Sequence, residues 1–379
     1  MRGIMIYPIN YRGSSNHGEV VAIVGMQFGS EGKGAIAAHL ANTVDFGVRS
    51  GAANAGHTIY YKGHRYVMRQ VPTTWINPRA KLVIGAGSLI SLDVLLQEIK
   101  VLSGVANIKS RLYVDHRAHV ITPEQIEKEQ ATDLASRIGS TSALSREGIG
   151  VAASDKVLRK ESCVQAKDHP DLTPYLADTV DMLNTSLDGA SRVLLEGTQG
   201  FDLSLDFGHF PYVTSRDTSA GALFASVGIA PHRFSTEIIG VVRTYPIRVA
   251  GNSGPFGEDS EELSWGEVAR RAGATEDITE RTSVTGNVRR VATFSKQGFK
   301  RACDVNRPTC IALTFADYLD WSVHNQERIT KPVEEFMGMI RGVSGVGDIS
   351  FVKTGPDTVV DFEMMKVQRF WKTLLKRAI

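Results

Sequence analysis

The stretch from residue 20 to residue 40 constrains the fold more than any other part of the chain. Residues 20–24 form a short apolar, mostly β-branched run that is typical of a buried strand. Four glycines follow between residues 25 and 34, and residues 35–40 are good helix formers. Glycine lets the backbone approach a ligand, and a helix N-terminus attracts anions. This strand, turn and helix therefore predict a phosphate-binding loop.

Lys33 lies inside this turn and offers a point charge to a phosphate. A Walker loop has a glycine five residues before its Gly-Lys pair and Ser or Thr after the pair. This chain has Gln27 and Gly34 at those positions. The alternative is a glycine-rich turn that only joins a strand to a helix. We favour a functional phosphate loop of a non-Walker kind.

Apolar runs alternate with helical patterns along most of the chain. Further strands are expected at residues 46–51, 82–84, 111–114, 193–195 and 237–242, with a hairpin at 59–68. Helices are expected at 91–101, at 123–134, and from Ser154 onward, where Lys156, Arg159 and Lys160 would share a face. Residues 138–153, rich in Gly, Ser and Thr, are expected to form a mobile loop. The pattern predicts an α/β fold with a mainly parallel central sheet and helices on both faces, and ligands at the carboxyl ends of the strands.

Composition excludes several classes of protein. Lys plus Arg exceed Asp plus Glu by 43 − 41 = 2, which argues against a nucleic-acid or membrane partner. The three cysteines include no C-x-x-C pair, which argues against a disulfide framework or zinc site and favours the reducing cytoplasm. No apolar stretch approaches the roughly 18 to 20 residues that cross a bilayer. We expect an N-terminal extension at residues 1–19 and a single large nucleotide-binding domain at residues 20–379.

Several other positions could carry chemistry, each with a plainer alternative. His57 follows two small residues and could act as an acid beside a phosphate, although a lone histidine is more often structural. Residues 285–290 place hydroxyl and guanidinium donors on a turn, and residues 210–218 place hydroxyls next to Arg216; both suit an anion. Asp317 could read a guanine edge or simply start a helix. Residues 354–357 could be only a turn.

Seven short motifs together point to one family. In chain order they are Gly29-Ser30-Glu31-Gly32-Lys33-Gly34, Asn54-Ala55-Gly56-His57-Thr58, Glu196-Gly197-Thr198-Gln199-Gly200, Pro211-Tyr212-Val213-Thr214-Ser215, Val249-Ala250-Gly251 before Gly254-Pro255-Phe256, Thr285-Gly286, and Thr354-Gly355-Pro356-Asp357. This ordered set, spread over roughly residues 20 to 360, resembles the adenylosuccinate synthetase family. An ordered set is more specific than any single motif, so it argues against all of these plainer alternatives at once.

The resemblance implies a homodimeric, Mg²⁺-dependent carbon–nitrogen ligase that joins L-aspartate to C6 of a 6-oxopurine nucleotide. A nucleoside triphosphate, ATP or GTP, would first phosphorylate the 6-oxygen, and the aspartate amine would then displace that phosphate. Lys33 and the loop amides would hold the transferring phosphoryl group, and His57 would act as general acid on the 6-oxygen. Charge neutralisation of this kind dominates phosphoryl transfer.

The resemblance also implies the residues of each part of the site. The catalytic positions are Ser30, Lys33, His57 and Gln199. The purine monophosphate would contact Ser30, Asn54, Ala55, Thr141, Gln199, Thr214 and Val249, with Arg159 entering from the second subunit. The triphosphate would contact Gly29, Ser30, Glu31, Gly32, Lys33, Gly34, Gly56, His57, Thr58, Asp317, Thr354, Gly355 and Pro356. The aspartate loop would be Ser283, Val284, Thr285, Gly286, Asn287, Val288 and Arg289, and the metal ligands Ser30 and Gly56.

The departures from the family pattern concern specificity. Ser30 stands where the family has an aspartate that serves as base and metal ligand, and a serine hydroxyl is not a base at neutral pH. Its smaller, neutral side chain leaves room for a 2-amino group, which favours a guanine nucleotide. Asn287 and Val288 replace arginines, one of which touches the ribose 2′-hydroxyl, and Phe315 replaces the lysine of the family's guanine-reading motif. The insertion between Thr141 and Gly148 also alters the phosphate-side loop.

These departures resemble the bacteriophage branch of the family, the 2-amino-2′-deoxyadenylosuccinate synthases, which use dGMP, aspartate and ATP to make the precursor of diaminopurine DNA. A phage-encoded enzyme would act in the host cytoplasm. One alternative is an ordinary adenylosuccinate synthetase that uses IMP and GTP. The other is a purine nucleotide sensor without catalytic activity, against which the intact Lys33, His57, Gln199 and Arg289 argue.

Overall fold

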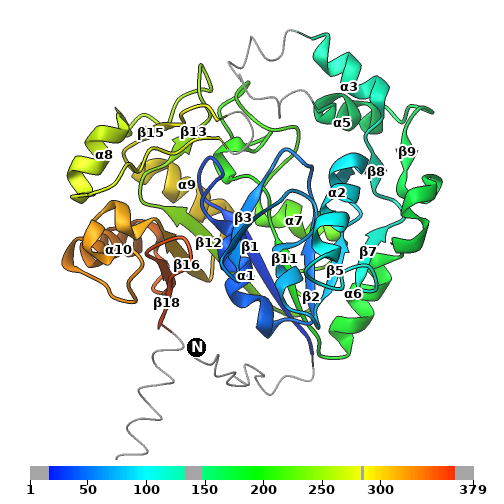
Figure 1. The fold of residues 1–379 in the computed structure, drawn as a ribbon, viewed down its shortest axis with the longest axis horizontal. Coiled ribbons are helices and arrows are strands. Elements are labelled where there is room, and N and C mark those ends of the chain that lie inside the picture. The colour runs from blue at the N-terminus through cyan, green and yellow to red at the C-terminus, as the bar shows by residue number, and fades with distance from the viewer. Residues whose placement is uncertain (1–16, 133–146, 283–285, 363–379) are drawn as a thin grey trace, which may run out of the picture.

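A computed structural model describes residues 17–132, 147–282 and 286–362 of the 379-residue chain. The predicted turn and the sheet around it form its centre (Figure 1). Within the described residues, no helix is both long and apolar enough to cross a membrane. Residues 1–16 lie outside the described part, so the division of the chain at residue 19 stays a prediction.

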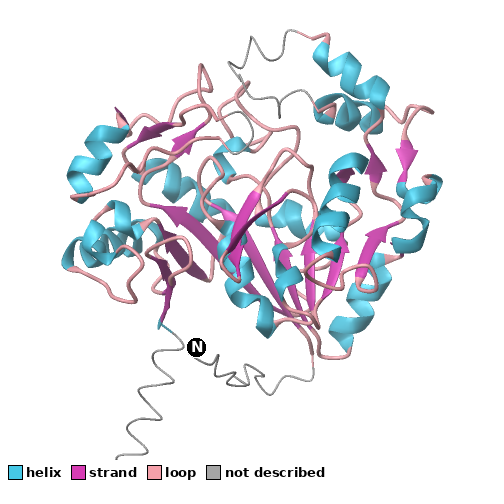
Figure 2. Ribbon diagram, viewed as in Figure 1, coloured by secondary structure: helices cyan, strands magenta, loops and turns pink. Residues whose placement is uncertain are grey.

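A ten-stranded sheet organises the molecule (Figure 2). From one edge to the other its strands are β10 (Leu176–Ala177), β7 (Leu112–Asp115), β5 (Lys81–Ile84), β2 (Phe46–Arg49), β11 (Arg192–Glu196), β1 (Glu19–Gly25), β12 (Ser235–Arg243), β16 (Cys310–Thr314), β17 (Ile349–Lys353) and β18 (Val359–Asp361). All neighbouring pairs are parallel except β17 and β18. The predicted mainly parallel sheet is confirmed. The carboxyl ends of its parallel strands all point to the same end of the sheet.

Helices cover both faces of this sheet, as predicted. They are α1 (Lys33–Leu40), α2 (Leu92–Ser103), α3 (Pro123–Gln130), α5 (Ile149–Val157), α6 (Thr179–Asp188), α7 (Ala220–Val227), α8 (Trp265–Ala272), α9 (Lys296–Asn306) and α10 (Lys331–Ser344). The side chains of β1 show why both faces are apolar. Val21 and Ile23 pack in one core cluster with residues of α1. Val20, Ala22 and Val24 pack in a second core cluster with residues of α6, α7, α9 and α10. A fully buried strand explains the continuous apolar run of residues 20–24.

Smaller sheets lie outside the main one. The predicted hairpin is present as β3 (His57–Tyr61) and β4 (His64–Met68), and it turns at Lys62-Gly63. The other two sheets are β6 (Leu89–Ile90), β8 (His119–Val120) and β9 (Val164–Gln165), and β13 (Ile247–Arg248), β15 (Arg290–Ala292) and β14 (Glu262–Leu263).

The prediction for residues 138–153 is wrong at its C-terminal end. Helix α5 begins at Ile149 and ends at Val157, so the helix expected from Ser154 starts earlier, and Arg159 and Lys160 lie beyond its end. The glycines that suggested a loop instead start the helix. Gly148 adopts φ 76°, and the Glu129 carboxylate accepts hydrogen bonds from the amides of Gly148 (2.7 Å) and Gly150 (2.6 Å).

Several other predicted boundaries also differ slightly from the structure. Strand β2 ends at Arg49 rather than residue 51, and α1 begins at Lys33 rather than residue 35. Helix α3 ends at Gln130, whereas the prediction extended to residue 134, which lies outside the described residues.

Candidate active site

The phosphate loop connects β1 to α1 in a left-handed conformation. Gly29, Ser30 and Gly32 adopt φ angles of 81°, 56° and 89°. The loop wraps around the Glu31 side chain, which is fully buried and accepts hydrogen bonds from the amides of Gln27 (3.1 Å) and Gly29 (2.8 Å). Glu31 was predicted among the triphosphate contacts, but its carboxylate points into the loop and stabilises the loop's shape.

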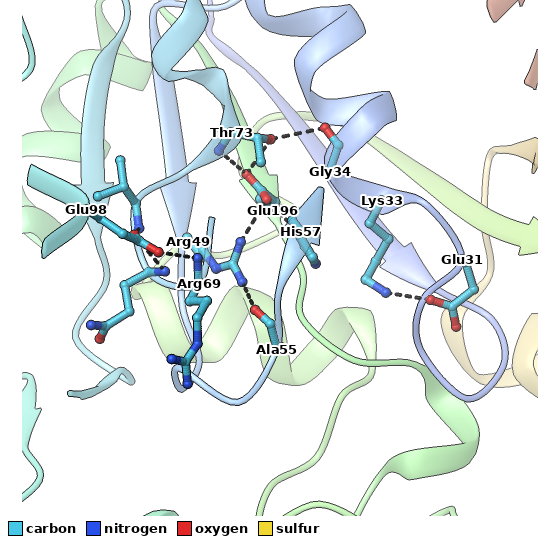
Figure 3. Close-up of polar contacts among 12 residues, drawn as sticks. Glu31, Lys33, Gly34, Arg49, Ala55, His57, Arg69, Thr73, Glu98 and Glu196 are labelled. Atoms are coloured by element: carbon cyan, nitrogen blue, oxygen red, sulfur yellow. Dashed lines mark hydrogen bonds and ion pairs between the residues drawn. The ribbon is translucent and has the colours of Figure 1, made fainter. Parts of the chain in front are cut away.

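Lys33 begins α1 and pairs with the same carboxylate (Figure 3). Its Nζ lies 2.5 Å from Glu31 Oε2, and both side chains are buried. No side chain caps the N-terminus of α1, which leaves the first helical amides available for an anion. A Cβ added to Gly34 would lie 2.6 Å from the Cβ of His57. Glycine at this position therefore lets the helix begin directly against the histidine.

His57, the first residue of β3, belongs to a buried network centred on Glu196 (Figure 3). Glu196 Oε1 accepts hydrogen bonds from His57 Nδ1 and from Arg49 Nη1 (3.0 Å). Glu196 Oε2 accepts from the amide (2.7 Å) and the hydroxyl (2.9 Å) of Thr73. Four donors thus converge on one carboxylate, which fixes the histidine ring against the phosphate loop.

The charge states within this network follow from burial. Burial and the nearby Arg49 guanidinium lower the pKa of His57 to about 4, although Glu196 opposes the shift. Burial alone would raise the pKa of Glu196, but His57, Arg49 and the Thr73 amide outweigh it and the net pKa is lowered. At neutral pH the imidazole is therefore uncharged and donates Nδ1–H to the carboxylate. Its Nε2 lone pair remains for a ligand.

A cavity of about 550 Å³ opens beside the loop, within the usual range for small-molecule sites. It brings together most of the predicted triphosphate residues with Arg289: Ser30, Gly32, Lys33, Gly34, Gly56, His57, Thr58, Arg289, Asp317, Gly355 and Pro356. Gly29, Glu31 and Thr354 do not line it. Thr354 lies just beneath, where its hydroxyl donates to the Gln326 carbonyl at 2.8 Å.

The far end of this cavity contains residues that the sequence did not reveal. His324 Nδ1 lies 2.7 Å from Asp317 Oδ2, and the His324 ring stacks on Trp321 with ring centroids 4.0 Å apart. Lys353 donates to the carbonyls of Gly355 and Pro356, and burial lowers its pKa to about 8. No motif connects these residues with Asp317; the only signal was an aromatic residue and a histidine within seven positions of it.

A second, smaller cavity of about 160 Å³ contains the predicted monophosphate residues Asn54, Gln199 and Thr214. Gln199 adopts φ 61°, and its amide donates to Thr214 Oγ1 (2.7 Å) and lies 3.4 Å from Asn54 Oδ1. The Ala55 carbonyl accepts a hydrogen bond from Arg49. These contacts join the loop after β2 to the loops after β11.

Other predicted monophosphate residues do not line this cavity. Val249 follows Arg248, whose guanidinium donates to the Tyr212 carbonyl at 3.2 Å. Arg159 is exposed just beyond α5 and does not line the cavity. Thr141 lies outside the described residues.

The predicted aspartate loop is described in part, because Ser283, Val284 and Thr285 lie outside the described residues. After them, Gly286, Asn287 and Val288 lead to Arg289. Val288 forms a β-bridge with Arg281, and the Thr282 amide donates to the Asn287 carbonyl at 2.9 Å. Arg289 Nη1 donates to Ser30 Oγ at 3.1 Å. This contact brings the loop's arginine to the phosphate loop.

A buried lysine at a glycine-rich loop and a neutral histidine in the same cavity define an α/β enzyme that binds nucleotides. Comparison with known proteins gives the family. The family model of adenylosuccinate synthetase matches residues 22–171 and 165–324. Adenylosuccinate synthetases of Thermococcus sibiricus and Methanocaldococcus jannaschii are 37% and 39% identical, over 88% of this chain and 95% and 94% of theirs. The chain belongs to the adenylosuccinate synthetase family and is a carbon–nitrogen ligase of purine nucleotide with aspartate.

Two solved structures share the fold. One is the succinoaminodeoxyadenylate synthetase PurZ of cyanophage S-2L, bound to dGMP and to dATP as an energy donor. It is 29% identical, with a TM-score of 0.76, and the match covers 91% of this chain and 95% of that one. The other is the fully ligated adenylosuccinate synthetase of Plasmodium falciparum, 21% identical with a TM-score of 0.75, covering 90% and 98%. The second likeness concerns the fold alone.

Proposed function

We propose that this enzyme joins L-aspartate to C6 of dGMP with hydrolysis of ATP. The product would be 2-amino-2′-deoxyadenylosuccinate monophosphate, a precursor of diaminopurine DNA. The observation that carries the proposal is Ser30 at the tip of the phosphate loop. Ser30 lines the cavity, and its hydroxyl accepts a hydrogen bond from Arg289. Because this side chain is short and neutral, it leaves space beside a purine for a 2-amino group. The bound dGMP in the cyanophage structure supports the same substrate.

The proposed reaction has two steps. The 6-oxygen of the base attacks the γ-phosphorus, the bond to the ADP oxygen breaks, and the N1 proton is released to water. The aspartate amine then attacks C6, the C6–O bond breaks, phosphate departs, and the nitrogen loses a proton. Lys33 and the α1 amides neutralise the transferring group. Anionic phosphates near His57 raise its pKa from about 4, so that Nε2 can carry a proton toward the 6-oxygen.

The residues present fit a magnesium ion that is carried mainly by the nucleotide. Mg²⁺ prefers oxygen ligands and usually binds through substrate phosphates with few protein ligands. Gly56 and Ser30 line the cavity and would offer a carbonyl and a hydroxyl as neutral oxygens, and Ser30 would exchange its Arg289 contact for this role. When bound, the ion would neutralise charge on the transferring phosphate.

We also infer a homodimer in which Arg159 enters the partner's monophosphate site. Arg159 is exposed, and the two residues before it, Val157 and Leu158, expose 77% and 63% of their surface. Apolar side chains exposed to this degree beside the smaller cavity suit burial against a second copy. Sedimentation equilibrium would test this, and a monomer at catalytic concentrations would contradict it.

One assay tests the proposed reaction. The protein is incubated with aspartate, Mg²⁺ and either dGMP or IMP, each with ATP or GTP, and the products are identified by mass. We expect product from dGMP with ATP. Product from IMP but none from dGMP would instead identify an ordinary adenylosuccinate synthetase, as the archaeal relatives are named. Binding without any product would contradict both reactions.

The matched variant for this assay is Ser30→Asp. The backbone at residue 30 has φ 56°, a conformation that aspartate tolerates, so the loop should keep its shape. We expect kcat/KM for dGMP to fall by about 10-fold or more, because a larger, charged side chain would meet the 2-amino side of the base. In the same variant, kcat/KM for IMP should fall less than kcat/KM for dGMP, or should rise. Unchanged dGMP turnover would contradict the size argument.

The contacts at Asp317 favour adenine over guanine in the triphosphate. Guanine presents two neighbouring donors, N1–H and N2–H, which suit both oxygens of a carboxylate. In this protein Asp317 Oδ2 already lies 2.7 Å from His324 Nδ1, so Oδ1 is the oxygen without that contact and suits the single amino group of adenine. We expect His324→Ala to lower the ATP-to-GTP ratio of kcat/KM by about 10-fold, the value of one hydrogen bond. Trp321→Ala removes the stacking and packing of that ring but neither member of the Asp317–His324 pair, so it should weaken both triphosphates equally. An unchanged ratio in His324→Ala would contradict this assignment.

A further inference from the structure

The smaller cavity contains an arginine that the proposed mechanism does not yet use. Arg216 lies between β11 and α7 and lines this cavity with Asn54, Gln199 and Thr214. A Cβ placed on Gly51 would lie 3.1 Å from Arg216 Nη1 and 2.6 Å from Thr198 Oγ1. The guanidinium and the hydroxyl thus converge on the same point of the loop after β2.

Neither group has a partner in the described part of the chain. Among those residues, no hydrogen bond or ion pair satisfies the guanidinium of Arg216, and the buried Thr198 hydroxyl also lacks a hydrogen bond. Thr198 is buried and Arg216 is partly buried. Buried polar groups are almost always paired, and a charge that is partly withdrawn from water without a partner is costly. A ligand in the cavity that supplies acceptors to the guanidinium would remove this cost at Arg216.

The cavity around Arg216 is positively charged. Lys156 of α5 also lines it, and no described carboxylate forms an ion pair with Lys156. None of the residues that line the cavity is acidic. Burial lowers the pKa of Arg216 to about 10, so the side chain is still charged at neutral pH. Two cations without lining carboxylates select an anion.

The size and position of the cavity identify the anion. A volume of about 160 Å³ is too small for a whole nucleotide, which needs at least about 300 Å³, but it suits a phosphate ester group. Gln199, Asn54 and Thr214, which are predicted to contact the purine monophosphate, line the same cavity. We propose that Arg216 binds the 5′-phosphate of the purine nucleoside monophosphate from within the same subunit.

This inference rests on the proposed function only in assigning the cavity to a nucleoside monophosphate. dGMP and IMP carry the same 5′-phosphate, so Arg216 would contact whichever of them is the substrate. If the wild-type protein binds neither nucleotide, the proposed function fails. If it binds one of them and Arg216 proves irrelevant to affinity, this inference fails and the proposed function stands.

The test is Arg216→Gln, measured by calorimetric titration with dGMP and IMP. We expect affinity for the accepted nucleotide to fall about 10- to 100-fold, as for loss of a charge-assisted phosphate contact, whereas KM for ATP stays unchanged. Competition by inorganic phosphate for the same site should weaken in parallel. Arg216→Lys should recover part of the affinity, because it keeps the charge but not the planar fork.

The control variant is Arg233→Gln, which removes a half-exposed arginine paired with Asp188 at 2.7 Å on the surface. It should leave both nucleotide affinities unchanged. A purely structural role for Arg216 predicts a different pattern, in which the variant weakens ATP and dGMP alike and unfolds at lower urea. That pattern, or unchanged affinity for dGMP and for inorganic phosphate, would overturn the inference.

Discussion

Lys33→Met is expected to lower kcat by about 100- to 1,000-fold, the usual effect of removing one group that stabilises transition-state charge. Lys33 is the only lysine of the phosphate loop, and it lies at the N-terminus of α1, where the transferring phosphoryl group would bind. The same substitution also leaves Glu31 buried without its cation. Loss of one partner of a buried pair costs about 3–5 kcal/mol of stability, so a lower melting temperature is expected as well.

A double variant separates these two effects. Glu31→Gln with Lys33→Met removes both charges of the pair, while the glutamine oxygen can still accept from the amides of Gln27 and Gly29. We expect the double variant to regain most of the lost melting temperature, measured by calorimetry, and to remain as inactive as Lys33→Met. Recovery of activity together with stability would show that Lys33 acts only on the fold of the loop.

The sequence contained enough to predict the sheet and the position of the site. Continuous apolar runs such as residues 20–24 can be satisfied only by strands buried on both faces, and strands of that kind form parallel sheets. Because these strands are parallel, the loops that follow β1, β2, β11 and β16 lie at the same end of the sheet. The family motifs follow these strands in the sequence. Residues far apart along the chain therefore had to meet at one site.

The side-chain network around His57 could not be predicted in the same way. Arg49 and Glu196 are directly opposite each other in the pairing of β2 with β11, so their contact depends on strand order and register. The two residues are 147 positions apart in the sequence, and no pattern connects them. His324 and Lys353 escaped prediction for the same reason. The glycines before α5 were misinterpreted because the capping carboxylate, Glu129, lies on another helix.

Glu196→Gln is expected to disable the site even though it changes one atom. Glu196 receives hydrogen bonds on both oxygens, from Arg49 and His57 on one side and from Thr73 on the other. A glutamine has one acceptor oxygen, so its amino group must face donors in either orientation. Arg49 also loses its buried counter-ion. We expect kcat to fall at least about 100-fold and stability to fall by about 3–5 kcal/mol.

The pKa of His57 distinguishes loss of this network from general damage. Glu196 raises that pKa against burial and Arg49, so removing its charge should lower the value further below about 4. NMR titration of His57 measures the shift. Glu98→Gln is the matched control, because Glu98 is also buried but accepts the amides of Gln70 (3.1 Å) and Val71 (2.8 Å) without touching His57. It should lose stability but keep the pKa of His57. An equal shift in both variants would show that the effect does not pass through the Glu196 hydrogen bond.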